Sequence, residues 1–146
     1  MIWETVDPEE INAIINHPEV YPHVAHGAAY PLDVAPLMDG DNIFIMAEGG
    51  GFAFIHLAED AYEGHYYFLP EFRGKYAIDT AKECLNWLAE HRMMLIGRTP
   101  LENKSARLFN KLIGMKRVGI SNDVEIWTWQ SGLQSPELLE LLVADS

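Results

Sequence analysis

The stretch from Leu69 to Glu83, LPEFRGKYAIDTAKE, places an arginine, a glycine and a lysine where an apolar run ends and a helical pattern begins. Backbone N–H groups at a helix N-terminus have no intrahelical acceptor, and the helix dipole makes this end positive. Such an end binds phosphate, and a glycine in front of it lets a ligand approach the backbone closely. Because Arg73 and Lys75 add positive charge, the spacing predicts a pyrophosphate cradle. The alternative is an ordinary solvated turn.

The distribution of charge along the chain also indicates an anion site. The chain has 146 residues and a formal net charge of −12. Residues 1–72 contain thirteen acidic residues and no Lys or Arg, whereas residues 73–117 hold all ten Lys and Arg against four acids. Residues 118–146 carry five acids. This pattern excludes a generally basic, nucleic-acid-binding surface. A local anion site in the middle third competes with simple pairing of basic and acidic segments across the fold.

Length and composition indicate one folded domain over residues 1–130. A chain of this size, 49% hydrophobic, can bury roughly two-thirds of the surface that it exposes when unfolded. No apolar run reaches the ~18 residues of a membrane span, and MIWETVDPEE lacks the features of a signal peptide. The single Cys84 excludes an internal disulfide and a cysteine-based zinc site. We expect a cytoplasmic monomer or homodimer without membrane or nucleic-acid partners, and a helical extension at residues 131–146 packed on the body or on a partner.

Hydrophobic periodicity and turn residues predict strands that alternate with helices. Asp7 followed by Pro8 is typical of a helix start, and apolar spacing predicts helices over residues 75–90 and 103–113, the second ending at Gly114. Strands are expected at IWETV, NIFIMA, FAFIHLA, GHYYFL, MMLIGR, MKRVG and VEIWTW, with the glycines of EGGG at a hairpin tip. The order predicts an α/β fold with a central mixed, mostly antiparallel sheet flanked by helices.

The run FLPEFRGKYA…AKECLNWL, followed by NKSARLFNKLIGMKRVG, resembles the GNAT superfamily of acetyl-coenzyme A-dependent N-acetyltransferases. The family pattern is a strand, P-E-x-R-G-x-G-x-G/A, a helix, a strand, and N-x-x-A at the start of a helix that ends in Leu/Ile-Gly-Phe. The motifs fall within residues 66–119. The matching positions are Pro70, Glu71, Arg73, Gly74, Lys75, Asn103, Ala106, Ile113 and Gly114. The resemblance implies a GNAT-like fold and acetyl transfer to a primary amine.

The resemblance also implies where acetyl-CoA, the expected cosubstrate, would bind. The loop and first helical turn of the first motif would hold its pyrophosphate, and the preceding strand would lie beside its pantetheine arm. The cofactor-binding residues expected on this basis are Phe68, Leu69, Arg73, Gly74, Lys75, Tyr76, Ala77, Ile78, Asn103 and Arg107. The sequence departs from the family at Tyr76 and Ile78, which stand in glycine positions.

Candidate catalytic residues follow from the chemistry of amine acetylation. The amine must be neutral to attack, so a base or a water chain removes its proton. Glu63, His65 and Tyr67 alternate on the strand before the motif and share one face, and Glu48 is a further candidate. Asn110 stands where many family members have a tyrosine that protonates the coenzyme A thiolate. Asparagine can donate a hydrogen bond to the sulfur but cannot supply a proton as tyrosine does.

The N-terminal segment is rich in tyrosine and histidine, and family resemblance implies that it lines the acceptor groove. The expected acceptor-binding residues are Tyr21, His23, His26 and Tyr30. An ordinary polar surface is the alternative interpretation. The His23-x-x-His26 spacing suits a metal on a helix, but no cysteine pattern accompanies it and no metal site is expected.

Two functions remain open at this point. In the first, the protein acetylates a small-molecule or protein amine. The acidic first half favours a cationic acceptor such as a polyamine, a lysine side chain or a protein N-terminus. In the second, the protein is a non-catalytic GNAT-fold binding or structural module with a degenerate coenzyme A site. The segment NHPEVYPHV resembles phage-encoded GNAT-like proteins, which would make the protein virion-associated.

Overall fold

A computed structural model of the chain describes residues 1–38 and 40–130. The strands are β1 (Ile2–Glu4), β2 (Ile43–Ala47), β3 (Gly50–Ala58), β4 (Ala61–Phe68), β5 (Met94–Pro100), β6 (Lys116–Ser121) and β7 (Val124–Gln130). The α-helices are α1 (Pro8–Ile15), α2 (Tyr21–Val24), α3 (Lys75–Glu90) and α4 (Lys104–Leu112), and the 3-10 helices are η1 (Ala35–Leu37) and η2 (Pro70–Phe72). None of the described helices is long and apolar enough to cross a membrane. The helix predicted for residues 131–146 lies outside the described residues.

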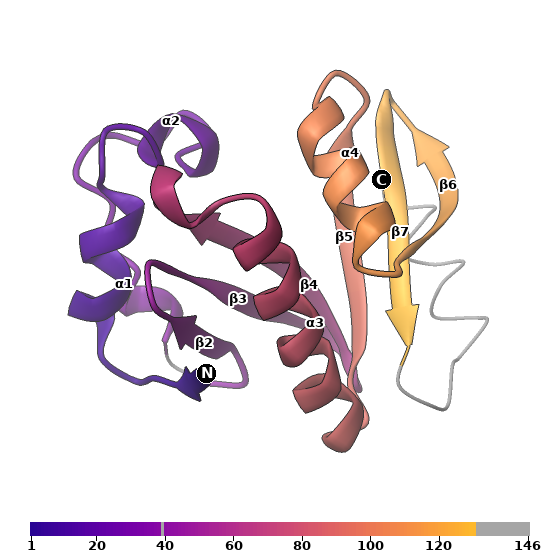
Figure 1. Ribbon diagram of the computed structural model, residues 1–146, viewed down its shortest axis with the longest axis horizontal. Coiled ribbons are helices and arrows are strands. Elements are labelled where there is room, and N and C mark those ends of the chain that lie inside the picture. Colours follow the sequence, from indigo (N-terminus) through magenta and orange to yellow (C-terminus); the bar gives the residue numbers. More distant parts are fainter. Residues whose placement is uncertain (39, 131–146) are drawn as a thin grey trace.

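The strands form one seven-stranded sheet in the order β1-β2-β3-β4-β5-β7-β6. Every neighbouring pair is antiparallel except β4 and β5, which run parallel at the centre. The long α3 helix is the crossover between these two strands (Figure 1). The predicted α/β fold with a mixed, mostly antiparallel sheet is therefore confirmed.

The core lies on both faces of the sheet, as the period-two alternation of side chains requires. On one face, α3 packs its buried Ala81, Leu85 and Leu88 against even-numbered residues of β3 and β4 such as Phe52 and Phe68. On the other face, α1 packs on the adjacent positions of the same strands. That second cluster contains Ile11, Ile15, Val20, Val34, Phe44, Met46, Ala53 and Tyr67.

The helix boundaries follow the local signals in the sequence. Asp7 accepts a hydrogen bond from the Glu9 backbone N–H at 3.0 Å, and Pro8 occupies the first turn of α1. Helix α3 begins at Lys75 after Gly74, as predicted. Helix α4 ends before Gly114, whose φ of 97° places it in the region that glycine adopts without strain.

The hairpin between β2 and β3 corrects one expectation. Only Gly49, with a φ of 75°, lies in the turn, whereas Gly50 and Gly51 belong to β3. A Cβ on Gly50 would lie 2.2 Å from Cδ1 of Phe68, and one on Gly51 would lie 2.7 Å from the carbonyl oxygen of Ile45. These two glycines therefore permit close packing inside the sheet rather than chain reversal.

Candidate functional site

The central strands β4 and β5 part to form a fork. Their parallel pairing consists of three residue pairs and ends at Glu63 with Ile96, although β4 continues to Phe68 and β5 to Pro100. Figure 1 shows the two strands diverging from this point, with α3 following β4 and α4 lying beside β5. The edges of β4 and β5 that face the opening therefore present backbone polar groups with no partner on the opposite strand in the described register.

A glycine marks the point of divergence. Gly64 directly follows the last residue of β4 that pairs with β5. A Cβ on Gly64 would lie 2.5 Å from Cδ1 of Leu95, so the Leu95 side chain fills the space that any other residue would need. The fork thus begins where β4 carries no side chain on its α3 face.

Two of the predicted catalytic residues meet at the base of this fork. The Glu63 carboxylate lies 3.1 Å from Nη1 of Arg98 and 3.8 Å from Nε2 of His65. His65 and Arg98 lower the pKa of the Glu63 carboxyl below its ordinary value, although burial acts in the opposite direction. Glu63 is therefore ionised at neutral pH, on the α1 face of the sheet.

Tyr67 lies on the same face of β4 but deeper in the protein. Its side chain is 5% exposed within the α1 cluster, and its hydroxyl has no hydrogen-bond partner among the described residues. Burial raises the pKa of the hydroxyl well above its ordinary range, so Tyr67 is neutral. Glu48 lies in the β2–β3 turn, whose Gly49 carbonyl accepts a hydrogen bond from the Leu69 N–H at the end of β4. The fold brings Glu63 and His65 together, but it places Glu48 beside the opposite end of β4, where Phe68 lies.

The rim of the fork is the N-terminus of α3. Gly74 is the N-cap, with φ 80° and ψ −134°, and nothing lies within 4 Å of the position a Cβ would take. The first amides of the helix have no intrahelical acceptor, and no acidic residue lies in its first turn. Lys75 extends from this turn, with Nζ 2.6 Å from the Asp79 carboxylate in an exposed ion pair.

Arg73 joins two parts of the chain beside this rim. Its Nε donates to the Phe68 carbonyl at 3.0 Å, and its Nη2 donates to the Glu19 carbonyl at 2.7 Å. The Arg73 side chain thus connects the end of β4 to the segment between α1 and α2 through two hydrogen bonds. This structural contact was not foreseen from the sequence, because its partners are backbone groups 5 and 54 residues away.

The two residues in glycine positions pack into the protein. The Tyr76 ring stands edge-on to Phe68 at 6.3 Å and to Phe72 at 5.5 Å between centroids. Ile78 packs against the α3 core cluster, and Ala77 between them is buried. Their side chains are therefore directed to the core, and the N-terminal amides of α3 stay open to a ligand.

An aromatic pair spans the fork on the helix side. The ring of Tyr66, from the free end of β4, stacks on Phe109 of α4 with centroids 4.3 Å apart and an interplanar angle of 26°. Neither residue is among the site residues that the sequence predicts. The available signal was the alternation of β4, which places Tyr66 and Phe68 on the face opposite to His65 and Tyr67.

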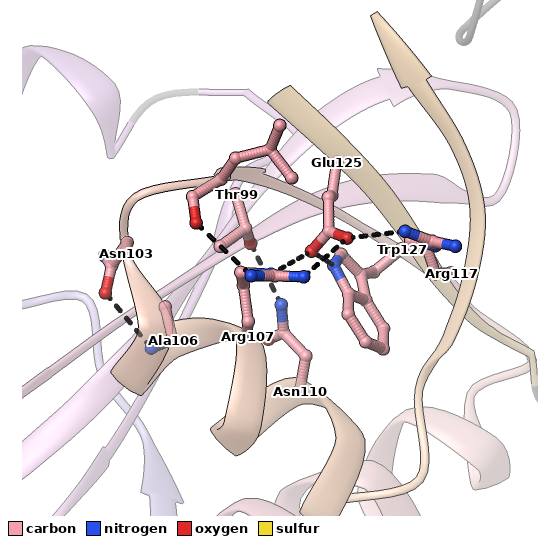
Figure 2. Close-up of polar contacts among 9 residues, drawn as sticks. Thr99, Asn103, Ala106, Arg107, Asn110, Arg117, Glu125 and Trp127 are labelled. Atoms are coloured by element: carbon pink, nitrogen blue, oxygen red, sulfur yellow. Dashed lines mark hydrogen bonds and ion pairs between the residues drawn. The ribbon is translucent and has the colours of Figure 1, made fainter. Parts of the chain in front are cut away.

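Helix α4 carries the second sequence motif (Figure 2). Asn103 is its N-cap, and the side-chain oxygen accepts from the Ala106 N–H at 3.1 Å. Asn110 is buried, and its Nδ2 donates to Oγ1 of Thr99 at 2.9 Å. Thr99 belongs to the part of β5 beyond its pairing with β4, so Asn110 lies over the free arm of the fork.

The carboxylate of Glu125 accepts hydrogen bonds from two arginines and a tryptophan next to α4 (Figure 2). Glu125 is 1% exposed, and its oxygens lie 2.7 Å from Nε of Arg107 and 3.0 Å from Nη1 of Arg117. The Trp127 indole N–H also donates to it, at 3.2 Å. Hydrogen bonds, that from Arg107 foremost, lower the pKa of Glu125, whereas desolvation raises it. Arg107, which the resemblance implies as a cofactor ligand, is thus paired with a buried carboxylate inside the protein. The cue for this pair in the sequence is the glutamate at an inward-facing position of VEIWTW.

The expected acceptor-binding residues gather around α2. The rings of Tyr21 and Tyr30 meet edge-to-face at 5.5 Å, and the Tyr21 hydroxyl donates to the Ala28 carbonyl. His23 and His26 are exposed near them. Among the described residues, no three His, Cys, Asp or Glu side chains gather in a way that could hold a metal ion.

One protein family matches most of this chain. A family described as "Protein of unknown function (DUF2824)" matches residues 6–131. The comparison with curated proteins gives no match.

Solved structures share the fold. An acetyltransferase of the GNAT family from Bacillus anthracis is 19% identical, with 89% of this chain and 93% of that chain covered and a TM-score of 0.64. A chimera of the spermidine N-acetyltransferase SpeG from Vibrio cholerae with hSSAT is 13% identical, covering 90% and 95%, with a TM-score of 0.66. An acetyltransferase from Streptococcus agalactiae is 14% identical, covering 89% and 97%, with a TM-score of 0.62. The fold is therefore that of the GNAT acetyltransferases.

Proposed function

We propose that this chain, which belongs to the family described as "Protein of unknown function (DUF2824)", is an N-acetyltransferase that moves the acetyl group of acetyl-CoA to a primary amine. The observation that carries the proposal is the fork between β4 and β5. It opens beside an uncapped helix N-terminus at Gly74 and has the ionised Glu63 at its base. The GNAT fold of the solved relatives supports the same reaction class.

The residues around the fork fit acetyl-CoA. The open N-terminus of α3 and the exposed Lys75 would hold the pyrophosphate, because free amides and a cation suit a dianionic group. The edge of β4 that has no partner on β5 would accompany the pantetheine arm near Phe68 and Leu69. The backbone groups available there exclude the Phe68 carbonyl, which accepts from Arg73, and the Leu69 N–H, which donates to the Gly49 carbonyl. When bound, acetyl-CoA supplies the thioester whose acyl carbon accepts the amine.

The chain's own groups handle the amine and its protons. Acetylation forms a carbon–nitrogen bond and breaks a carbon–sulfur bond. An ammonium acceptor loses two protons in total, one before it attacks and one after, and the thiolate gains one proton. The Glu63 carboxylate, ionised at neutral pH, attracts an ammonium group and accepts its proton directly or through water. Asn110 offers an amide and no acidic proton, so solvent or the departing amine proton must neutralise the thiolate.

The acceptor in this proposal is a cationic amine. Residues 1–72 include β1 to β4 and the segment around α2, and they contain thirteen acidic residues and no Lys or Arg. Their negative charge would attract a cationic amine to this part of the protein, which contains Glu63. The similarity to a spermidine N-acetyltransferase structure fits this charge, and we propose polyamines as the first acceptors to test. A cytoplasmic location and a monomeric or homodimeric state stay predictions.

One observation favours a second function, a GNAT-fold protein that binds without turnover. The stacked Tyr66 and Phe109 rings span the fork, so a ligand entering between the strands from the helix side must displace them. The amide of Asn110 is also engaged with Thr99. The two functions differ in one respect that can be measured, which is the release of coenzyme A.

The test is acetyl-CoA binding followed by turnover. We expect acetyl-CoA to raise the melting temperature and to bind in calorimetry at millimolar or lower concentration. With acetyl-CoA saturating, thiol release should then accelerate when spermidine, lysine or an N-terminal peptide is added. Binding without acceleration by any amine would support the second function. Absence of binding would exclude the acetyltransferase and leave a structural module with a degenerate coenzyme A site.

Replacing Gly74 with alanine is expected to weaken acetyl-CoA binding about tenfold, the loss of roughly one hydrogen bond to a charged group. The methyl group would extend into the open space at the start of α3, where nothing beyond the two neighbouring residues lies within 4 Å, and would narrow the approach of a phosphate to the helix. The backbone strain at φ 80° should also lower the free energy of unfolding by about 1–3 kcal/mol. Calorimetry and chemical denaturation measure the two effects.

Gly27→Ala is the matched control. Gly27 has a φ of 86° and equally open surroundings, so it should show the same loss of stability with unchanged acetyl-CoA affinity. Equal affinities for the Gly74 and Gly27 variants would contradict the placement of the pyrophosphate at α3.

A further inference from the structure

The surface formed by α4 and β6 exposes four large apolar side chains. On α4, Leu108 and Leu112 are 57% and 47% exposed, one helical turn apart. On β6, Val118 and Ile120 are 44% and 50% exposed. Ile120 pairs with Glu125 of β7, whose side chain meets Arg107 of α4, so Ile120 lies on the face of the sheet that α4 covers. We call this surface the α4–β6 groove.

Two hollows adjoin in this groove. One has a volume of about 350 Å³ and is lined by residues 117–120. The other has a volume of about 240 Å³ and is lined by Arg107, Leu108, Lys111, Arg117, Glu125 and Trp127. Arg117 borders both hollows, so they meet at this residue, and the second lies between α4 and the strands β6 and β7. Together their linings include aliphatic side chains, three cations and the buried carboxylate of Glu125.

Strand β6 also ends the sheet. It pairs with β7 on one side and is last in the strand order, so its other edge carries backbone groups with no partner strand in the described sheet. Proteins usually cover or interrupt such an edge. Exposed aliphatic residues next to an open edge indicate that another segment packs here.

We propose that residues 131–146 of the same chain cover the α4–β6 groove. Their sequence, SGLQSPELLELLVADS, has four leucines and a valine within residues 138–143. Glu137, Glu140 and Asp145 are its charged side chains, with no Lys or Arg. Apolar and acidic composition thus matches a groove whose exposed residues are aliphatic and basic. In this proposal the segment that covers the groove belongs to the same chain and not to a second protein.

The position and length of the segment allow this contact. It follows Gln130 at the end of β7, the strand that pairs with β6, and Lys116 at the start of β6 pairs with Thr128. Sixteen residues reach at most about 55 Å when extended. The six residues of β6 span only about 20 Å. The segment therefore has enough length to return along the groove.

Hydrogen exchange of the full-length protein tests the proposal. We expect backbone amides of residues 137–143 to exchange about tenfold or more slowly than in a free peptide of the same sequence. Ile120→Asp and Lys111→Glu should each remove most of this protection, because one introduces a charge among the apolar contacts and the other reverses a charge that faces the acids. Leu37→Asp, at a residue 49% exposed on η1, is the control and should leave the protection unchanged.

The outcomes separate the occupants of the groove. Protection that is independent of protein concentration, and lost in the two groove variants only, is the expected result. Protection that appears only at high concentration would assign the groove to the segment of a second copy and overturn the proposal. Free-peptide exchange rates in the wild type would also overturn it, and exchange in β5 peptides shows that each variant is folded.

Discussion

Glu63→Gln is expected to lower kcat/KM for amine acetylation by about 10²-fold or more, the usual scale for loss of a general base. The amide keeps the shape of the side chain but removes the negative charge that now faces Arg98 and His65 at the base of the fork. The loss should fall mainly on steps that involve the amine, because Glu63 lies on the α1 face and not at the α3 N-terminus. Thiol release at varied amine and saturating acetyl-CoA measures it.

Glu59→Gln provides the control for this change. Glu59 is an exposed acid in the turn before β4 and has no ion pair with Arg98, so it tests the general effect of removing one negative charge. Acetyl-CoA affinity should be the same within a few-fold for wild type and both variants. A Glu63→Gln variant as active as Glu59→Gln would show that Glu63 takes no part in the reaction.

Glu125→Ala is expected to lower the free energy of unfolding by about 3 kcal/mol, the lower end of the range for breaking a buried ion pair. The carboxylate is 1% exposed and accepts hydrogen bonds from Arg107, Arg117 and Trp127. Its removal leaves the indole N–H buried without this acceptor, whereas the two partly exposed guanidinium groups can regain water and moderate the loss. Chemical denaturation at neutral pH measures the difference.

The effect of Glu125→Ala on the free energy of unfolding is also expected to depend on pH in the acid range. Because the pKa of Glu125 is lower in the folded protein than its ordinary value of 4.5, its contribution is present above pH 4.5 and is lost as pH falls below it. The stability difference between wild type and Glu125→Ala should therefore shrink in that range. Glu102→Ala, which removes an exposed acid beside α4, should change stability little. A difference between wild type and Glu125→Ala that stays constant to pH 3 would contradict the role of the ionised carboxylate.

The fold was largely predictable because its signals are local. Asp7 with Pro8, the apolar period of α3, and Gly114 each act within one or two helical turns, and the structure has helix boundaries at all three. The glycines after Glu48 were misassigned because turn and strand glycines look alike in sequence. What distinguishes Gly50 is the ring of Phe68, which arrives from another strand.

The candidate site was predictable in residue types but not in contacts. The family resemblance implies Arg73 and Arg107 as cofactor-binding residues. The fold gives Arg73 the carbonyl of Glu19 and gives Arg107 the carboxylate of Glu125, both distant in sequence. The fork itself depends on where β4 stops pairing with β5, which no single segment encodes. Pairing of Glu63 with Arg98 across 35 residues is likewise a product of that register.

Mass spectrometry of the products, after incubation of the protein with acetyl-CoA and spermidine, tests whether this chain transfers an acetyl group to an amine. We expect spermidine carrying one added acetyl group, formed in equal amount to free coenzyme A, at a rate that is proportional to protein concentration and reduced by Glu63→Gln. Binding of acetyl-CoA with no acetylated product from spermidine or any amine of the panel would contradict the proposed acetyl transfer.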